Sequence, residues 1–156
     1  MLKKKYQFRL FADYFQFYIQ DEQATGDLSD AWNKESCNIG LAVAPGTLGV
    51  GTARNMIVPV VLEIHDSVPN EDFEKWDRVN ECSIDVPSGC IVIAGCTDYF
   101  PEAKRISVEA QCYRARVYYG GQNVVADDYA EGHDHYRIVL WPASSYTGIT
   151  ILKPVV

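Results

Sequence analysis

The residues best suited to chemistry are concentrated in one acidic stretch that also contains two of the three histidines. Its members are Asp127, Asp128, Glu131, His133, Asp134 and His135. If His133 and His135 lie on an extended strand, their spacing of two residues puts both imidazole rings on one face, as a metal site requires. Two histidines are too few, so a third ligand would have to come from Asp128, Asp134 or His65.

The same stretch is also typical of a solvated acidic loop that leads into a strand. It contains no recognised metal-ligand spacing, and we therefore favour the loop. We predict no bound metal and no other cofactor. A metal-binding β-sandwich enzyme or module that uses His133 and His135 is the alternative.

The histidines could also serve a nucleophilic enzyme, in which a histidine and an orienting carboxylate activate a cysteine or serine. The chain has no G-x-S-x-G sequence to mark such a serine. Its five cysteines include no C-x-x-C pair, and three of them, Cys82, Cys96 and Cys112, lie in apolar alternating segments. That pattern is typical of buried thiols in a reducing compartment. We predict no catalytic residue, and a cysteine–histidine enzyme remains an alternative.

A glycine-rich passage, Gly46–Gly51, is the only other segment that suggests a known chemistry. It lacks the Gly-Lys-Ser/Thr ending of a phosphate-binding loop, and no helical pattern follows it. We assign it to a turn region that precedes a central strand.

The charge of the chain limits its partners. With 14 basic and 21 acidic residues, the formal net charge is -7, which repels a phosphate backbone unless the positive charges are segregated. The basic run Lys3-Lys4-Lys5 is expected to be a solvated end, with a membrane or phosphate contact as the alternative. No run of 18 or more apolar residues occurs, and no uninterrupted apolar segment follows the lysines. We expect a soluble, cytoplasmic protein that binds neither nucleic acid nor membrane.

Short segments of alternating polarity must position these residues. About nine or ten such segments are separated by turn signals, and almost no long helical period occurs. This pattern predicts an all-β fold, a jelly-roll-like β-sandwich of short antiparallel strands in a single domain spanning residues 1–156. The alternation changes phase near Ala12-Asp13 and again at Cys112-Tyr113, so we predict a tight turn or bulge at the first point and a bulge or corner at the second.

Three local features complete the expected fold. The segments 82–86 and 90–96, joined by Pro87-Ser88-Gly89, predict a β-hairpin. The polar stretch 21–35 predicts a loop that closes in a short helical turn capped by Ser29 or Asp30, with Trp32 as its anchor into the core. Inward-facing residues are also expected from the spacing of three between Phe73, Trp76 and Val79.

The aromatic residues offer another class of function. Seven tyrosines could line a sugar-binding or protein-binding face: Tyr14, Tyr18, Tyr113, Tyr118, Tyr119, Tyr129 and Tyr136. Aromatic side chains on alternating strand positions more often pack within sheets, so we expect most of them to be structural. A carbohydrate-binding β-sandwich is the third functional alternative.

The first hundred residues contain a resemblance to a known family. The order Tyr14-Phe15-Gln16-Phe17-Tyr18, then Asp21, Ala31-Trp32 and Gly40, followed by a turn region rich in Ala and Gly and a later hairpin, resembles the competence protein J family of small bacterial nuclease inhibitors. The final third of the chain matches that pattern only loosely. The resemblance implies a cytoplasmic protein that acts by binding a nuclease or toxin.

The charge supports the same function independently. Nucleases that grip phosphates carry basic surfaces, and a protein of net charge -7 is steered towards them. We therefore predict a protein-binding inhibitor or immunity-type module whose partner is a basic nuclease or toxin. Its partner-binding residues are predicted to be the densest acidic group, Asp127, Asp128, Glu131 and Asp134. The oligomeric state does not follow from the sequence.

Overall fold

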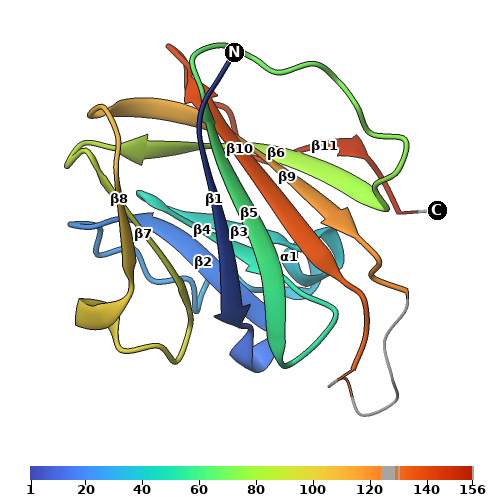
Figure 1. The fold of residues 1–156 in the computed structure, drawn as a ribbon. Helices are drawn as coiled ribbons and strands as arrows, with labels where there is room; N and C mark the ends of the chain where they lie inside the picture. Colours follow the sequence, from blue (N-terminus) through green and yellow to red (C-terminus); the bar gives the residue numbers. More distant parts are fainter. Residues whose placement is uncertain (124–128, 130, 156) are drawn as a thin grey trace.

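Two β-sheets packed face to face form the protein in the computed structural model, which describes residues 1–123, 129 and 131–155 (Figure 1). One sheet has six strands in the order β1-β5-β10-β9-β6-β11, and the other has five in the order β3-β4-β2-β7-β8. The strands are β1 (Leu2–Phe11), β2 (Gln16–Asp21), β3 (Leu41–Ala44), β4 (Thr47–Gly51), β5 (Ile57–His65), β6 (Arg78–Val86), β7 (Cys90–Gly95), β8 (Lys104–Ser107), β9 (Gln111–Gly120), β10 (His135–Pro142) and β11 (Thr150–Lys153). The predicted all-β sandwich is confirmed.

Two details differ from the prediction. The glycine-rich passage is itself a strand, β4, which pairs with both β2 and β3 and so lies inside the five-stranded sheet. In addition, β5 and β10 are parallel neighbours, whereas antiparallel strands were expected throughout. Parallel neighbours require a long connection, and here the chain between them passes through the other sheet.

The core lies between the sheets and is built by alternation along each strand. In β2, Phe17 and Ile19 are fully buried while their neighbours are only partly so. The facing sheet contributes inward residues such as Tyr136 and Ile138 of β10, and the rings of Phe17 and Tyr136 meet edge to face at 5.7 Å. Burial of these side chains is the main stabilising contribution to the sandwich.

Two connections in which the chain leaves one sheet for the other lie at or near the predicted phase changes. Between β1 and β2 it passes through a 3-10 turn, η1 (Asp13–Phe15), and β1 pairs in the six-stranded sheet while β2 pairs in the five-stranded one. Between β8 and β9 the chain again changes sheets, within residues 108–110. A second 3-10 turn, η2 (Phe100–Glu102), precedes β8. The predicted turn near Ala12-Asp13 is confirmed, whereas the bulge or corner predicted at Cys112-Tyr113 is misplaced, because these residues lie in the regular strand β9 and the chain changes sheets before it.

The predicted hairpin at Pro87-Ser88-Gly89 is wrong. Strand β6 belongs to the six-stranded sheet and β7 to the five-stranded sheet, so the turn joins the two layers. The buried carboxylate of Asp21 holds this turn by accepting hydrogen bonds from the Ser88 amide, at 3.0 Å, and from the Ser88 hydroxyl. Alternation and turn residues predict that two strands are joined tightly, but they do not determine which strands pair.

Covering segments lie on the outer faces of both sheets. The helix α1 (Lys34–Ile39) begins at Asn33, whose side chain caps it, rather than at the predicted Ser29 or Asp30. Trp32 packs on the outer face of the five-stranded sheet against Gly49 and donates a hydrogen bond to Gln16, so it is not in the core. No helix in the described ranges is long and apolar enough to cross a membrane.

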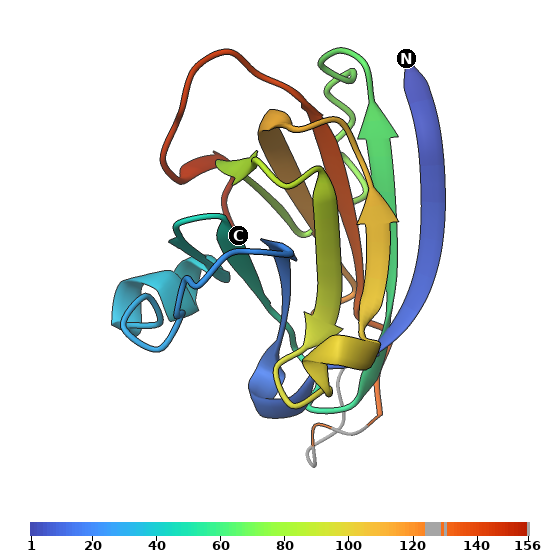
Figure 2. The same ribbon diagram turned by 90° about the vertical axis from the view of Figure 1, so that its left-hand side faces the viewer.

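The segment 66–77 crosses the outer face of the six-stranded sheet. There Phe73 and Trp76 pack on a second apolar cluster that includes Val79, Tyr118 and Trp141. The prediction that Phe73, Trp76 and Val79 face inward is therefore wrong. Phe73 and Trp76 pack on the outer face of the six-stranded sheet, where they meet Val79 of β6. At the lower end of Figure 2 the two sheets converge, where Gly95 of β7 lies directly against the backbone of Phe11.

Candidate functional site

The acidic stretch belongs to the connection between β9 and β10, and the strand ends that this connection joins lie at the lower end of Figure 1. This connection has two arms, one that follows β9 and one that precedes β10, and the arms approach each other closely at Gly121 and His133. Gly121 has a φ of +61°, and a Cβ atom there would lie 2.4 Å from the His133 carbonyl oxygen, so only glycine fits. The arms are therefore brought together by backbone geometry before any side chain is considered.

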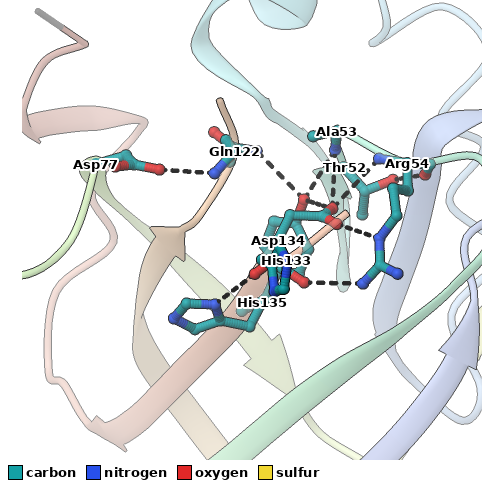
Figure 3. Close-up of polar contacts among 9 residues, drawn as sticks. Thr52, Ala53, Arg54, Asp77, Gln122, His133, Asp134 and His135 are labelled. Carbon is teal, nitrogen blue, oxygen red and sulfur yellow. Dashed lines mark hydrogen bonds and ion pairs between the residues drawn. The ribbon is translucent and has the colours of Figure 1, made fainter. Parts of the chain in front are cut away.

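The centre of the loop base is the carboxylate of Asp134, which is completely buried (Figure 3). One of its oxygens accepts hydrogen bonds from the Ala53 amide at 3.2 Å, the Arg54 amide at 3.3 Å and the Tyr136 hydroxyl. The other oxygen is paired with the Arg54 guanidinium, which also donates to the Asp134 carbonyl at 3.2 Å. A buried carboxylate is tolerated only when it is paired and hydrogen-bonded in this way.

Tyr136 joins the two sides of this network. Its hydroxyl accepts from the Ala53 amide at 2.8 Å and from the Gln122 side chain at 3.3 Å, and it donates to Asp134. Burial raises the pKa of the Tyr136 phenol, and its hydrogen bond to the Asp134 carboxylate raises it further. The phenol therefore stays protonated and acts as a fixed donor rather than as an acid.

The opposite arm is held by a separate contact. The Gln122 amide donates to the Asp77 carboxylate at 2.8 Å, which ties the loop to the segment that covers the outer face. The Thr52 hydroxyl, which lies in the connection between β4 and β5, donates to the Arg54 carbonyl at 2.8 Å. Three connections of the sandwich are thus hydrogen-bonded to one another through these residues (Figure 3).

The structure places the predicted partner-binding acids in different environments. Glu131 is exposed. Asp134 is buried, which corrects its predicted role: its carboxylate faces Arg54 inside the protein and does not reach the surface. Asp127 and Asp128 lie outside the described residues. Sequence spacing could not separate these environments because the partner of Asp134 is 80 positions away along the chain.

The two histidines do not form a metal site with the described residues. The His135 ring packs on Trp76 at 5.3 Å, and its Nδ1 donates to the His133 carbonyl at 2.9 Å. His65 lies at the opposite end of β5, hydrogen-bonded to Glu63 at 2.9 Å, so the strand register keeps it far from His135. Within the described ranges, no three His, Cys, Asp or Glu side chains are grouped as metal ligands would be.

The thiols show no sign of activation. All five cysteines are free, and burial raises the pKa of Cys82 to about 12. Among the hydrogen bonds described, none joins a histidine ring to a thiol or a hydroxyl. A nucleophile needs such a base within hydrogen-bond reach. Of the three thiols predicted to be buried, Cys82 is buried, whereas Cys96 and Cys112 are only partly buried.

The residue that sequence analysis missed is Arg54. It stands in a short polar connection with nothing in its neighbourhood to mark it. In the structure its guanidinium forms an ion pair with the buried Asp134, so the positive charge of Arg54 is neutralised within the protein. The exposed carboxylate of Glu131 is left as a surface charge.

The fold and site define a class of protein: an all-β sandwich whose connection between β9 and β10 has a hydrogen-bonded base and, among its described residues, the exposed acid Glu131. No protein-family model matches the sequence, and no curated protein matches it.

Two solved structures are similar in fold. The crystal structure of ComJ from Bacillus subtilis, described as an inhibitor of the DNA-degrading activity of NucA, superposes with a TM-score of 0.63 at 20% sequence identity. The match covers 92% of this chain and 99% of ComJ. The structure described as crocagin biosynthetic gene J has a TM-score of 0.58 at 14% identity and covers 89% of this chain and 97% of its own. The predicted resemblance to the competence protein J family is thus confirmed as a likeness of fold.

Proposed function

We propose that this protein is an inhibitor-type module that binds a basic nuclease or toxin through the acidic loop between β9 and β10. The observation that carries the proposal is the contrast between two acids of this connection: Asp134 is buried and paired with Arg54, whereas Glu131, three positions earlier, is exposed. Asp127 and Asp128 belong to the same loop by sequence. The role described for ComJ, which shares the fold, supports a nuclease as the partner.

The mechanism follows from charge. A nuclease gathers cationic groups where it holds phosphates, and a carboxylate-rich loop competes for those groups. The net charge of -7 steers the encounter, so the association rate should fall as salt screens the surface charges. The described base of the loop is already fixed by the Asp134–Arg54 pair, so these residues lose little conformational freedom on binding.

The test is a DNA-degradation assay with NucA and a panel of other basic nucleases, with binding measured in parallel by calorimetry. The loop variant carries Asp127→Asn, Asp128→Asn and Glu131→Gln. The control variant carries Glu71→Gln, Asp72→Asn and Glu74→Gln, three exposed acids on the segment that covers the outer face. Both variants remove the same charge, so they weaken long-range steering equally.

We expect the wild-type protein to inhibit at least one nuclease. The loop variant should bind at least about tenfold more weakly, a loss of about 1.4 kcal/mol, while the control should change only through its weaker steering. Absence of inhibition across the panel, or equal loss in both variants, would contradict the proposal.

A further inference from the structure

Exposed apolar side chains gather at the same end of the molecule as the acidic loop. We name this group the end patch: Phe11, Tyr14, Phe15, Met56, Ile57 and Tyr129, which are each between 39% and 70% exposed. They come from three segments, namely the end of β1 with η1, the connection into β5, and the loop between β9 and β10. Contiguous exposed apolar surface of this kind marks sites of interaction.

Two pairs of residues within the end patch lie side by side. Phe11 and Ile57 face each other across the β1–β5 pair, so their side chains lie on the same side of the sheet. The rings of Phe15 and Tyr129 meet edge to face at 5.5 Å. The Asn55 amide also donates to the Tyr129 carbonyl at 2.9 Å, which fixes that residue beside the connection into β5.

The backbone beneath these rings is strained. Among the described residues, the non-glycine positions with positive φ are Tyr14 at 56°, Phe15 at 60° and Tyr129 at 57°, and all three belong to the end patch. A side chain is disfavoured in this left-handed region, and aromatic residues are rarely found there. Such strain persists only where the surroundings enforce it, and it clusters at binding sites.

Specific hydrogen bonds enforce this conformation. The Thr52 amide donates to the Phe15 carbonyl at 2.8 Å, and the Thr97 hydroxyl donates to the Asp13 carboxylate at 3.0 Å. The turn is therefore held from both sides while Tyr14 stays 70% exposed. A ring held outward in this way offers a large contact area with little entropy left to lose on binding.

The charges around the end patch indicate its occupant. Asp13 immediately precedes Tyr14, and the exposed Glu131 follows Tyr129 by two residues, so each of these tyrosines has an acidic residue within two positions along the chain. The described ion pairs include neither acid, whereas Arg54 is neutralised by Asp134. An apolar centre with acidic flanks is complementary to apolar side chains ringed by Lys and Arg.

The neighbouring cations do not cancel this pattern. Arg9 and Lys104 line a hollow together with the acidic residues Asp98 and Glu102, so carboxylates balance their charge there. A second copy of the chain is disfavoured as occupant, because a two-fold contact would bring the same acidic flanks together.

We infer that the end patch is the contact surface for the partner, a basic protein that seats apolar side chains over Tyr14, Phe15 and Tyr129. The inference rests on the proposed function for the identity of the partner and adds the surface that binds it. The acids of the loop then attract and orient the partner, while the strained rings provide the desolvated centre of the interface.

The experiment is the double variant Tyr14→Asn/Tyr129→Asn, measured by calorimetry against the nuclease that wild-type protein binds. Asparagine tolerates the left-handed conformation better than an aromatic residue, so the fold should keep its Tm or gain slightly. The control is Tyr146→Asn, which removes a tyrosine that is 68% exposed in the connection between β10 and β11. If the double variant fails to fold, Tyr14→Gly replaces it, since glycine adopts that backbone without strain.

We expect at least about tenfold weaker binding for the double variant, equal to about 1.4 kcal/mol, and no change for the control. Wild-type affinity in the double variant would overturn the inference and leave the proposed function intact. If wild-type protein binds no nuclease, both the proposed function and this partner are rejected. A wild-type dimer in sedimentation that the double variant dissolves would instead assign the end patch to a second copy.

Discussion

Replacing Asp134 with asparagine should loosen the base of the acidic loop and destabilise the whole protein. The substitution keeps the shape of the side chain but removes its charge. In one orientation the new amide group faces the Arg54 guanidinium, and in the other it faces the amides of residues 53 and 54. Donors meet donors in either case, so some buried hydrogen-bonding groups lose their acceptor.

The size of the effect follows from burial. Breaking a buried ion pair by removing one partner costs about 3–5 kcal/mol. The Asp134 side chain is 0% exposed but that of Arg54 is 13% exposed, so water can partly solvate the guanidinium and the lower end of that range applies. For a chain of 156 residues, about 3 kcal/mol corresponds to a fall in Tm of roughly 6–12 °C.

Thermal and urea unfolding of purified protein measure this change. Glu131→Gln is the matched control, because it neutralises an exposed acid of the same loop and should alter stability by less than about 0.5 kcal/mol. Arg54→Met should cost at least as much as Asp134→Asn, since it leaves a carboxylate that is 0% exposed without its counter-charge. A fall in Tm for Asp134→Asn no larger than that of the Glu131 control would refute the anchoring role of this pair.

Three further predictions concern the rest of the sandwich. Although burial opposes ionisation of Glu63, hydrogen bonds from Arg137 and from the neighbouring histidine prevail and lower its pKa below the ordinary 4.5, so its stabilising contribution is present above that pH and lost on acidification. Urea titrations should show that Glu63→Gln lowers the free energy of unfolding at pH 7. The difference in this free energy between pH 7 and pH 4 should be smaller in the variant than in the wild-type protein, and an unchanged difference would contradict the prediction. In the native protein a thiol reagent should modify the exposed Cys37 and not Cys82, which is buried and has a pKa of about 12; rapid native labelling at Cys82, read by mass spectrometry, would contradict its burial. Gly95→Ala should destabilise by at least about 1 kcal/mol because the added Cβ would lie 2.0 Å from a backbone oxygen at the end of β1, and an unchanged Tm would show that the sheets can separate there.

Much of the fold was predictable because period-two alternation is a local property. The change of phase near Ala12-Asp13 marks the first passage between sheets, and the change at Cys112-Tyr113 follows the later one. At the first place the chain turns where the alternation changes, but the second change of sheet falls at residues 108–110, before Cys112-Tyr113, so the alternation indicates a change of face without locating it to the residue.

Other features were not predictable because they depend on distant residues. The turn at Pro87-Ser88-Gly89 has the local chemistry of a hairpin, yet its flanking strands pair in separate sheets. Position 49 lies within strand β4 and is glycine because Trp32 packs directly against it. A glycine-rich sequence does not reveal this contact. The partner of each strand is determined by how the complete sheets bury their apolar faces. The sequence of one segment does not show which strand it will pair with.

By itself, the sequence determined that this is an acidic chain of short strands, that the core lies between alternating faces, and that one acidic loop stands out among its connections. Only the tertiary structure decided what each acid in that loop does. Asp134 and Glu131 are three positions apart, but one is paired with Arg54 inside the protein and the other is exposed. The reason is physical: the environment of a carboxylate is set by groups that folding brings from far along the chain, and spacing alone does not reveal them.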